Sequence, residues 1–75
     1  MDITNFILKF SEQFDETDSS LFTPNTQFKT LEEWSSFMAL SIIAMVDEEY
    51  GVEISGEDIR NTETIEELFN AVKQK

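Results

Sequence analysis

Two adjacent serines, Ser35 and Ser36, stand at the start of the most strongly helical segment of the sequence, and an acidic run beginning with Asp47 stands near its end. A serine hydroxyl at a helix start can cap the helix or carry a covalent group. Clustered carboxylates can bind a cation, act as an acid–base pair or attract a basic partner.

The acidic run does not fit a calcium loop or a catalytic carboxylate pair. A loop of the EF-hand type needs glycine at its position 6, but counting from Asp47 places Gly51 at position 5 and Val52 at position 6. Carboxylates on the exposed helix turns of so small a domain have no enclosed substrate site to serve. The acidic residues are therefore either a solvated face or a docking patch for a basic partner.

Other residue types that common chemistry requires are missing. The 75 residues include no histidine and no cysteine. Their absence excludes Ser–His–Asp and Cys–His mechanisms, disulfides and the common zinc sites. We therefore expect no catalytic residue and no metal site, and we expect that the protein is not an enzyme.

The charge balance indicates the kind of partner. Acidic residues outnumber basic ones by 16 to 5, which gives a formal net charge of −11. Such a chain repels nucleic acid and anionic membranes and favours a basic protein surface. No apolar run approaches the roughly 20 residues of a membrane span, and the chain does not start with a basic-then-apolar signal pattern. We expect a cytoplasmic protein without membrane insertion.

The first predicted helix spans about residues 2–16. Its apolar side chains recur at the spacing of one helix face. That face consists of Ile3, Phe6, Ile7, Phe10 and Phe14. A long connection rich in turn-forming residues follows. Either burial of its own aromatic residues, Phe22 and Phe28, holds it in place, or it moves for function.

The second predicted helix runs from Ser36 to Tyr50 and stops at Gly51, a residue suited to the left-handed conformation of a helix end. Ser35 or Ser36 can cap it. Its apolar residues extend nearly all the way round, and we expect Phe37 to be exposed. The opposite side is expected to face the core and consists of Ala39, Ile42, Ile43, Val46 and Tyr50.

Two shorter patterns complete the chain. Residues 55–58 resemble a capping box that opens a short helical turn, and Thr64 with Glu67 predicts a second capping box at the start of the last helix. The apolar face of this last helix consists of Ile65, Leu68, Phe69 and Val72. The expected fold is a single all-α domain over residues 1–75. It is a small four-helix bundle of three longer helices and one short helix, with the long loop between the first two helices.

The second helix opens with Trp-Ser-Ser-Phe at residues 34–37, and Gly51 follows Ser36 after 15 residues, within Asp-Glu-Glu-Tyr-Gly-Val-Glu-Ile at residues 47–54. This pattern, together with the order of the helices over nearly the whole chain, resembles the acyl carrier protein family. In that family an Asp-Ser-Leu motif begins the second helix, and its serine carries 4′-phosphopantetheine. The corresponding residues here are Ser35-Ser36-Phe37.

The resemblance implies that Ser36 carries a 4′-phosphopantetheine arm, whose thiol holds acyl or aminoacyl groups as thioesters and delivers them to partner enzymes. The implied partners are a phosphopantetheinyl transferase and acyl-transferring enzymes with basic surfaces. Fatty acid biosynthesis, polyketide or peptide assembly and surface-sugar acylation all use such carriers, so the cargo stays open. The implied docking residues are Phe37, Ser41, Ala44, Asp47, Glu48, Glu53, Glu57 and Asp58.

A second interpretation, from another functional class, is an acidic helical interaction module without a prosthetic group. It stays open because Ser35 and Phe37 replace the residues that usually flank the family's serine. Under both interpretations we expect a monomer that binds basic protein surfaces.

Overall fold

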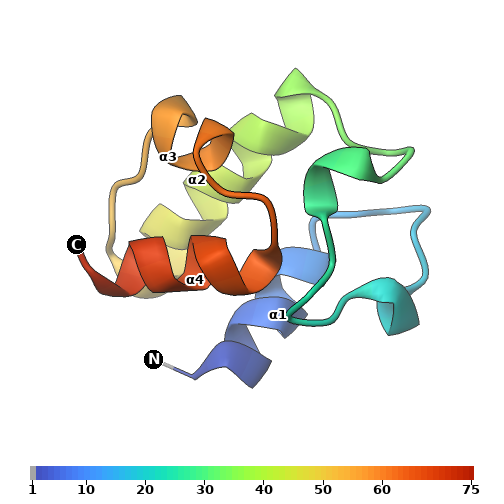
Figure 1. The fold of residues 1–75 in the computed structure, drawn as a ribbon, viewed down its shortest axis with the longest axis horizontal. Coiled ribbons are helices and arrows are strands. Elements are labelled where there is room, and N and C mark those ends of the chain that lie inside the picture. Colours follow the sequence, from blue (N-terminus) through green and yellow to red (C-terminus); the bar gives the residue numbers. More distant parts are fainter. Residues whose placement is uncertain (1) are drawn as a thin grey trace.

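The computed structural model describes residues 2–75 and contains four α-helices, which are α1 (Ile3–Ser11), α2 (Ser36–Tyr50), α3 (Gly56–Arg60) and α4 (Ile65–Lys73). The long connection from α1 to α2 lies on the right in Figure 1 and contains two short 3₁₀ turns, Ser19–Leu21 and Phe28–Thr30. The predicted all-α fold, a small bundle of three longer helices and one short one, is confirmed. No strand occurs within residues 2–75, and none of their helices is long and apolar enough to cross a membrane.

Helix α1 is shorter than the helix predicted over residues 2–16, because it ends at Ser11. The N–H groups of Gln13 and Phe14 bond to carbonyl groups three residues back, so the chain tightens into a turn. Phe14 is buried all the same, with its ring centre 5.6 Å from that of Phe10. The apolar pattern therefore identified the core residue correctly but gave the wrong end for the helix.

The chain after this turn is held by Glu33. The Glu33 carboxylate accepts hydrogen bonds from the backbone N–H groups of Asp15 and Glu16, at 2.9 and 3.1 Å, and from the hydroxyl of Thr17 at 2.8 Å. In a longer helix, these two N–H groups would have bonded to carbonyl groups of the preceding turn. The contact with Glu33 replaces those helical bonds and turns the chain away from the axis of α1.

The connection between α1 and α2 is held by its aromatic side chains, which is the first of the two alternatives that the sequence leaves open. Phe22 and Phe28 are buried against Phe10, with ring centres 6.1 and 5.4 Å away. Trp34, just before α2, packs edge-on against Phe28 at 5.1 Å. Leu21 is 56 % exposed and does not contribute to this packing.

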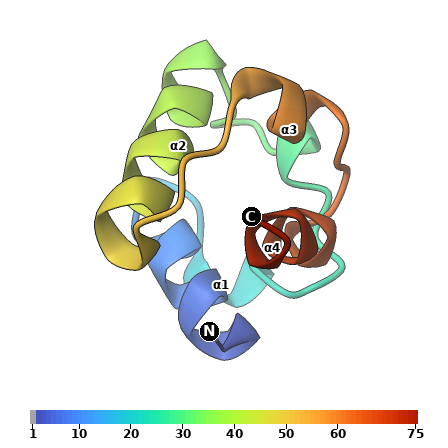
Figure 2. The same ribbon diagram turned by 90° about the vertical axis from the view of Figure 1, so that its left-hand side faces the viewer.

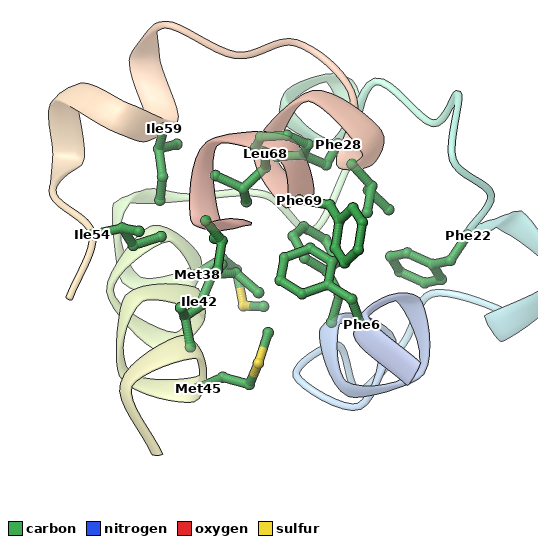
Figure 3. Packing of buried hydrophobic residues seen from close by; sticks show 14 of the residues in the cluster. Phe6, Phe22, Phe28, Met38, Ile42, Met45, Ile54, Ile59, Leu68 and Phe69 are labelled. Carbon is green, nitrogen blue, oxygen red and sulfur yellow. The ribbon is translucent and has the colours of Figure 1, made fainter. Parts of the chain in front are cut away.

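One hydrophobic core joins the four helices and the connection. Figure 2 shows α1 to α4 arranged around a central region, and Figure 3 shows the side chains that fill it. The apolar face predicted for the last helix is buried in full, and it consists of Ile65, Leu68, Phe69 and Val72.

Helix α2 has the bounds that the sequence predicts, with Gly51 at φ 66° as its left-handed end. The side of α2 that faces the core shares Ile42 and Val46 with the predicted side but differs from it in its other residues. Ala39, Ile43 and Tyr50 are only partly buried. Because the helix is apolar nearly all round, its periodicity does not define its rotation, and packing against α1 and α3 does. The buried side consists of Met38, Ile42, Met45 and Val46, of which Figure 3 labels the first three.

The two predicted capping boxes have different outcomes. The first is confirmed at α3, where the side chains of Ser55 and Asp58 each accept the other's backbone N–H. At α4 the hydroxyl of Thr64 accepts the N–H of Glu67 at 3.2 Å, as predicted. The prediction of the reciprocal bond, from the N–H of Thr64 to the Glu67 carboxylate, is wrong, because this carboxylate accepts the N–H of Glu63 instead, at 2.7 Å. The chain entering α4 is held by an antiparallel bridge to the long connection, and Glu63 is the residue whose N–H lies within reach.

Candidate functional site

The two serines at the start of α2 have different roles. Ser35 is the N-cap residue, and its hydroxyl oxygen accepts the N–H of Met38 at 3.2 Å. Ser36 is the first residue of the helix and is exposed. Within residues 2–75, no hydrogen bond engages the Ser36 hydroxyl. The cap, which the sequence assigns to either serine, is therefore supplied by Ser35, and the Ser36 oxygen is accessible.

An open pocket with a volume of about 540 Å³ lies beside Ser36, between the start of α2 and α3. Half of the side chains that line it are apolar, and Trp34 forms one wall. That wall is held from behind by the rings of Phe14 and Phe28, whose centres lie 6.4 and 5.1 Å from that of Trp34. The pocket is lined by Lys29, Trp34, Ser35, Ser36, Ala39, Leu40, Gly56, Ile59 and Arg60.

The two charged residues of this pocket, Lys29 and Arg60, are both basic, although the chain carries a net charge of −11. The Lys29 ammonium donates hydrogen bonds to the carbonyl groups of Ile59 and Arg60, at 3.2 and 3.1 Å, and so fastens the end of α3. Among the described residues, no carboxylate lies within 4.0 Å of either basic group. Neither residue is among those that the sequence predicts for the site, since the two lie 31 positions apart in the chain.

An exposed face of α2 extends from the start of the helix to its acidic end. Phe37 is 73 % exposed, as predicted, and Leu40 is 65 % exposed. Leu40 was missing from the predicted docking residues, although its position three residues after Phe37 places it on the same face. Ser41 lies on this side but is half-buried. The remaining exposed members of this face are the predicted docking residues Ala44, Asp47 and Glu48.

A second, smaller pocket of about 320 Å³ connects this face of α2 to the segment after Gly51. It brings two of the predicted acidic docking residues, Asp47 and Glu53, to the edge of an apolar surface. Because Leu40 lines both pockets, the surface beside Ser36 is continuous with this acidic one. The pocket is lined by Leu40, Ile43, Ala44, Asp47, Glu53 and Ile54.

The last two predicted docking residues lie on α3, and only one of them is fully exposed. Glu57 is exposed. The Asp58 carboxylate accepts the N–H of Ser55 at 2.9 Å and pairs with the Lys75 ammonium at 3.1 Å. The Ser55 bond, followed by the Lys75 bond, holds the pKa of Asp58 below its ordinary value of 3.8. Asp58 thus joins α3 to the end of the chain, which leaves fewer of its oxygen lone pairs for a partner.

No group of carboxylates within residues 2–75 is arranged so that it could hold a metal ion. The features that converge on one side of the molecule are the accessible Ser36 hydroxyl, a pocket with two basic groups and an apolar face with an acidic end. No protein family, no curated protein and no solved structure matches this chain.

Proposed function

We propose that the protein is a carrier that holds acyl or aminoacyl groups as thioesters on a 4′-phosphopantetheine arm attached to Ser36. One observation carries this proposal. The Ser36 hydroxyl is exposed and unbonded among the described residues, while the adjacent Ser35 supplies the cap of α2. Ser36 can therefore be modified without loss of the hydrogen bond that stabilises the helix start.

The surroundings of Ser36 favour a phosphate ester. Ser36 and Phe37 occupy the first two positions of α2, where backbone N–H groups have no partner within the helix. These groups and the helix dipole favour a negative charge. No carboxylate lines the pocket beside Ser36.

The arm would supply a thiol, which the chain lacks because it has no cysteine. No histidine is available as a general base to activate Ser36. A transferase therefore has to bring both the base and the metal ion for the loading reaction. The role of this chain is to present the hydroxyl and to bind the transferase.

The exposed face of α2 provides the surface for such partners. Phe37 and Leu40 lie close to Ser36 along the helix and offer apolar contact. Asp47 and Glu48 follow toward the other end and offer negative charge to a basic surface. A partner that binds this face would have its own reactive groups close to Ser36.

Measuring the intact mass after incubation with coenzyme A and a phosphopantetheinyl transferase tests the proposal. The wild-type protein is expected to gain the mass of one phosphopantetheine, and Ser36→Ala is expected to gain none. Ser35→Ala is the matched control, because it removes the neighbouring hydroxyl and should still be loaded. A gain that persists in Ser36→Ala would contradict the assignment of the site.

A wild-type protein that gains no mass with several different transferases would favour the alternative function, an acidic helical interaction module without a prosthetic group. The exposed Phe37 and Leu40 support that alternative, because they can contact a partner whether or not Ser36 is modified.

A further inference from the structure

We infer that Lys29 and Arg60 bind the phosphate of the group attached to Ser36, in the pocket between the start of α2 and α3. This inference rests on the proposed carrier function, and it adds residues that the carrier resemblance did not imply. If it is correct, the arm leaves Ser36 on the α3 side of the helix. The part of the exposed α2 face that does not line this pocket, including Phe37, then stays clear for partner enzymes.

The distribution of the 5 basic residues supports this site. Lys9 lies 3.7 Å from the carboxylate of Glu49, and Lys75 lies 3.1 Å from that of Asp58. The Lys73 ammonium lies over the ring of Phe69, 5.2 Å from its centre. These three positive charges thus have partners of their own.

Lys29 and Arg60 differ from the other basic residues in their surroundings. Within residues 2–75 neither forms an ion pair, although the chain has 16 acidic residues, and both line the pocket that includes Ser36. No acidic residue lines this pocket. A pocket with two positive charges and no negative one suits an anion, and the one expected there is the phosphate on Ser36.

Lys29 and Arg60 also have enough free hydrogen-bond donors to bind a phosphate. The Lys29 ammonium has three donors and uses two of them, on the carbonyl groups of Ile59 and Arg60, so one is left for a phosphate oxygen. These two bonds hold the ammonium in place before any ligand arrives. The Arg60 guanidinium has five donors in a planar fork that matches two phosphate oxygens. Its Nη1 atom would lie 3.5 Å from a Cβ atom at Gly56, so the guanidinium lies over the start of α3.

Amide ¹H–¹⁵N spectra of the apo protein and of the phosphopantetheine-loaded protein test the inference. We expect loading to shift the amide signals of residues 56–60 as well as those of Ser36 and Phe37. In the Arg60→Gln variant, the shift change that loading causes in residues 56–60 should be smaller than in the wild-type protein by about half or more, because the variant lacks one of two charge-assisted contacts. Salt at about 1 M, where the Debye length is about 3 Å, should reduce the same shift change in the wild-type protein.

Lys73→Gln is the matched control. It removes the same charge from α4, outside the pocket, and should leave the loading-induced shifts of residues 56–60 unchanged. Arg60 is exposed, so Arg60→Gln is expected to fold, and a well-dispersed apo spectrum checks this.

Two results would overturn the phosphate site while leaving the carrier function intact. One is a loaded wild-type protein whose signals from residues 56–60 do not shift. The other is an Arg60→Gln variant in which the shift change is undiminished. A wild-type protein that cannot be loaded at all would overturn both the site and the carrier function, so the two failures can be told apart by the intact mass.

Discussion

The hydroxyl oxygen of Ser35 accepts the backbone N–H of Met38 at 3.2 Å, which makes Ser35 the cap of α2. Ser35→Ala is therefore expected to lower the free energy of unfolding by about 1 kcal/mol, the usual value of a serine cap. Ser36→Ala removes an exposed hydroxyl and should change the free energy of unfolding by less than about 0.5 kcal/mol. Urea unfolding of both variants measures the difference. Equal losses in the two variants would show that the cap is shared between the serines.

Phe37 and Leu40 are expected to contribute to partner binding and little to folding, because both are largely exposed. The double variant Phe37→Ala/Leu40→Ala should weaken binding of a phosphopantetheinyl transferase about tenfold or more, as expected for central apolar contacts. Titration calorimetry with the transferase measures the change. Leu8→Ala is the control, since Leu8 is 51 % exposed on α1, outside this face. A similar loss of binding in the control would argue against a defined apolar contact on α2.

The acidic end of α2 is expected to attract a basic partner. Asp47→Lys/Glu48→Lys should slow association with the transferase at low salt, and the effect should shrink as salt screens the charges. Asp15→Lys/Glu16→Lys changes the net charge by the same amount and lies outside α2. Association rates measured across a range of salt concentrations separate the two variants. If both variants slow association equally, net charge and not a local patch is responsible.

Glu33 is expected to make stability depend on pH. Its pKa lies below the ordinary value of 4.5, chiefly because the Thr17 hydroxyl bonds to its ionised form, with further bonds from the N–H groups of Asp15 and Glu16. The folded state therefore favours the carboxylate. The stabilisation is complete above pH 4.5 and is lost as the pH falls through the lowered pKa of the folded protein.

Glu33→Gln should consequently be less stable than the wild-type protein at pH 7, and the difference should shrink below about pH 4.5. Thermal unfolding between pH 3 and pH 7 measures this. Glu32→Gln is the control, because Glu32 is the exposed neighbour whose side chain makes no hydrogen bond within residues 2–75. A difference between Glu33→Gln and the wild-type protein that does not change with pH would contradict this role.

Phe28 is expected to hold the long connection in place. Its side chain is fully buried against Phe10 and Trp34, so Phe28→Ala should cost about 3–5 kcal/mol. Such a loss is comparable to the total stability of a small domain. Leu21→Ala, in the same connection but at an exposed position, should cost less than about 0.5 kcal/mol. Denaturant unfolding compares the two, and a small loss for Phe28→Ala would mean that the connection is not fastened there.

The sequence alone was enough for the features that depend on residues close together in the chain. The bounds of α2 were predicted because each depends on a residue at that end of the helix. At the start, the Ser35 hydroxyl accepts the N–H of Met38 at 3.2 Å. At the end, Gly51 adopts the left-handed conformation, with a φ of 66°. The buried face of α4 was predicted because its apolar residues form one narrow stripe. The exposure of Phe37 also followed from its place on α2.

Tertiary structure was needed wherever distant residues meet. Beyond the end of helix α1 at Ser11, the path of the chain depends on Glu33, more than a dozen residues away, which accepts the N–H groups of Asp15 and Glu16. The side of α2 that is buried depends on its neighbours, since an almost wholly apolar helix has no preferred rotation of its own. Lys29 and Arg60, 31 positions apart, come together beside Ser36 only because the end of α3 is fastened to the long connection. Helix periodicity and caps report local backbone preferences, whereas these contacts depend on how the helices pack against one another.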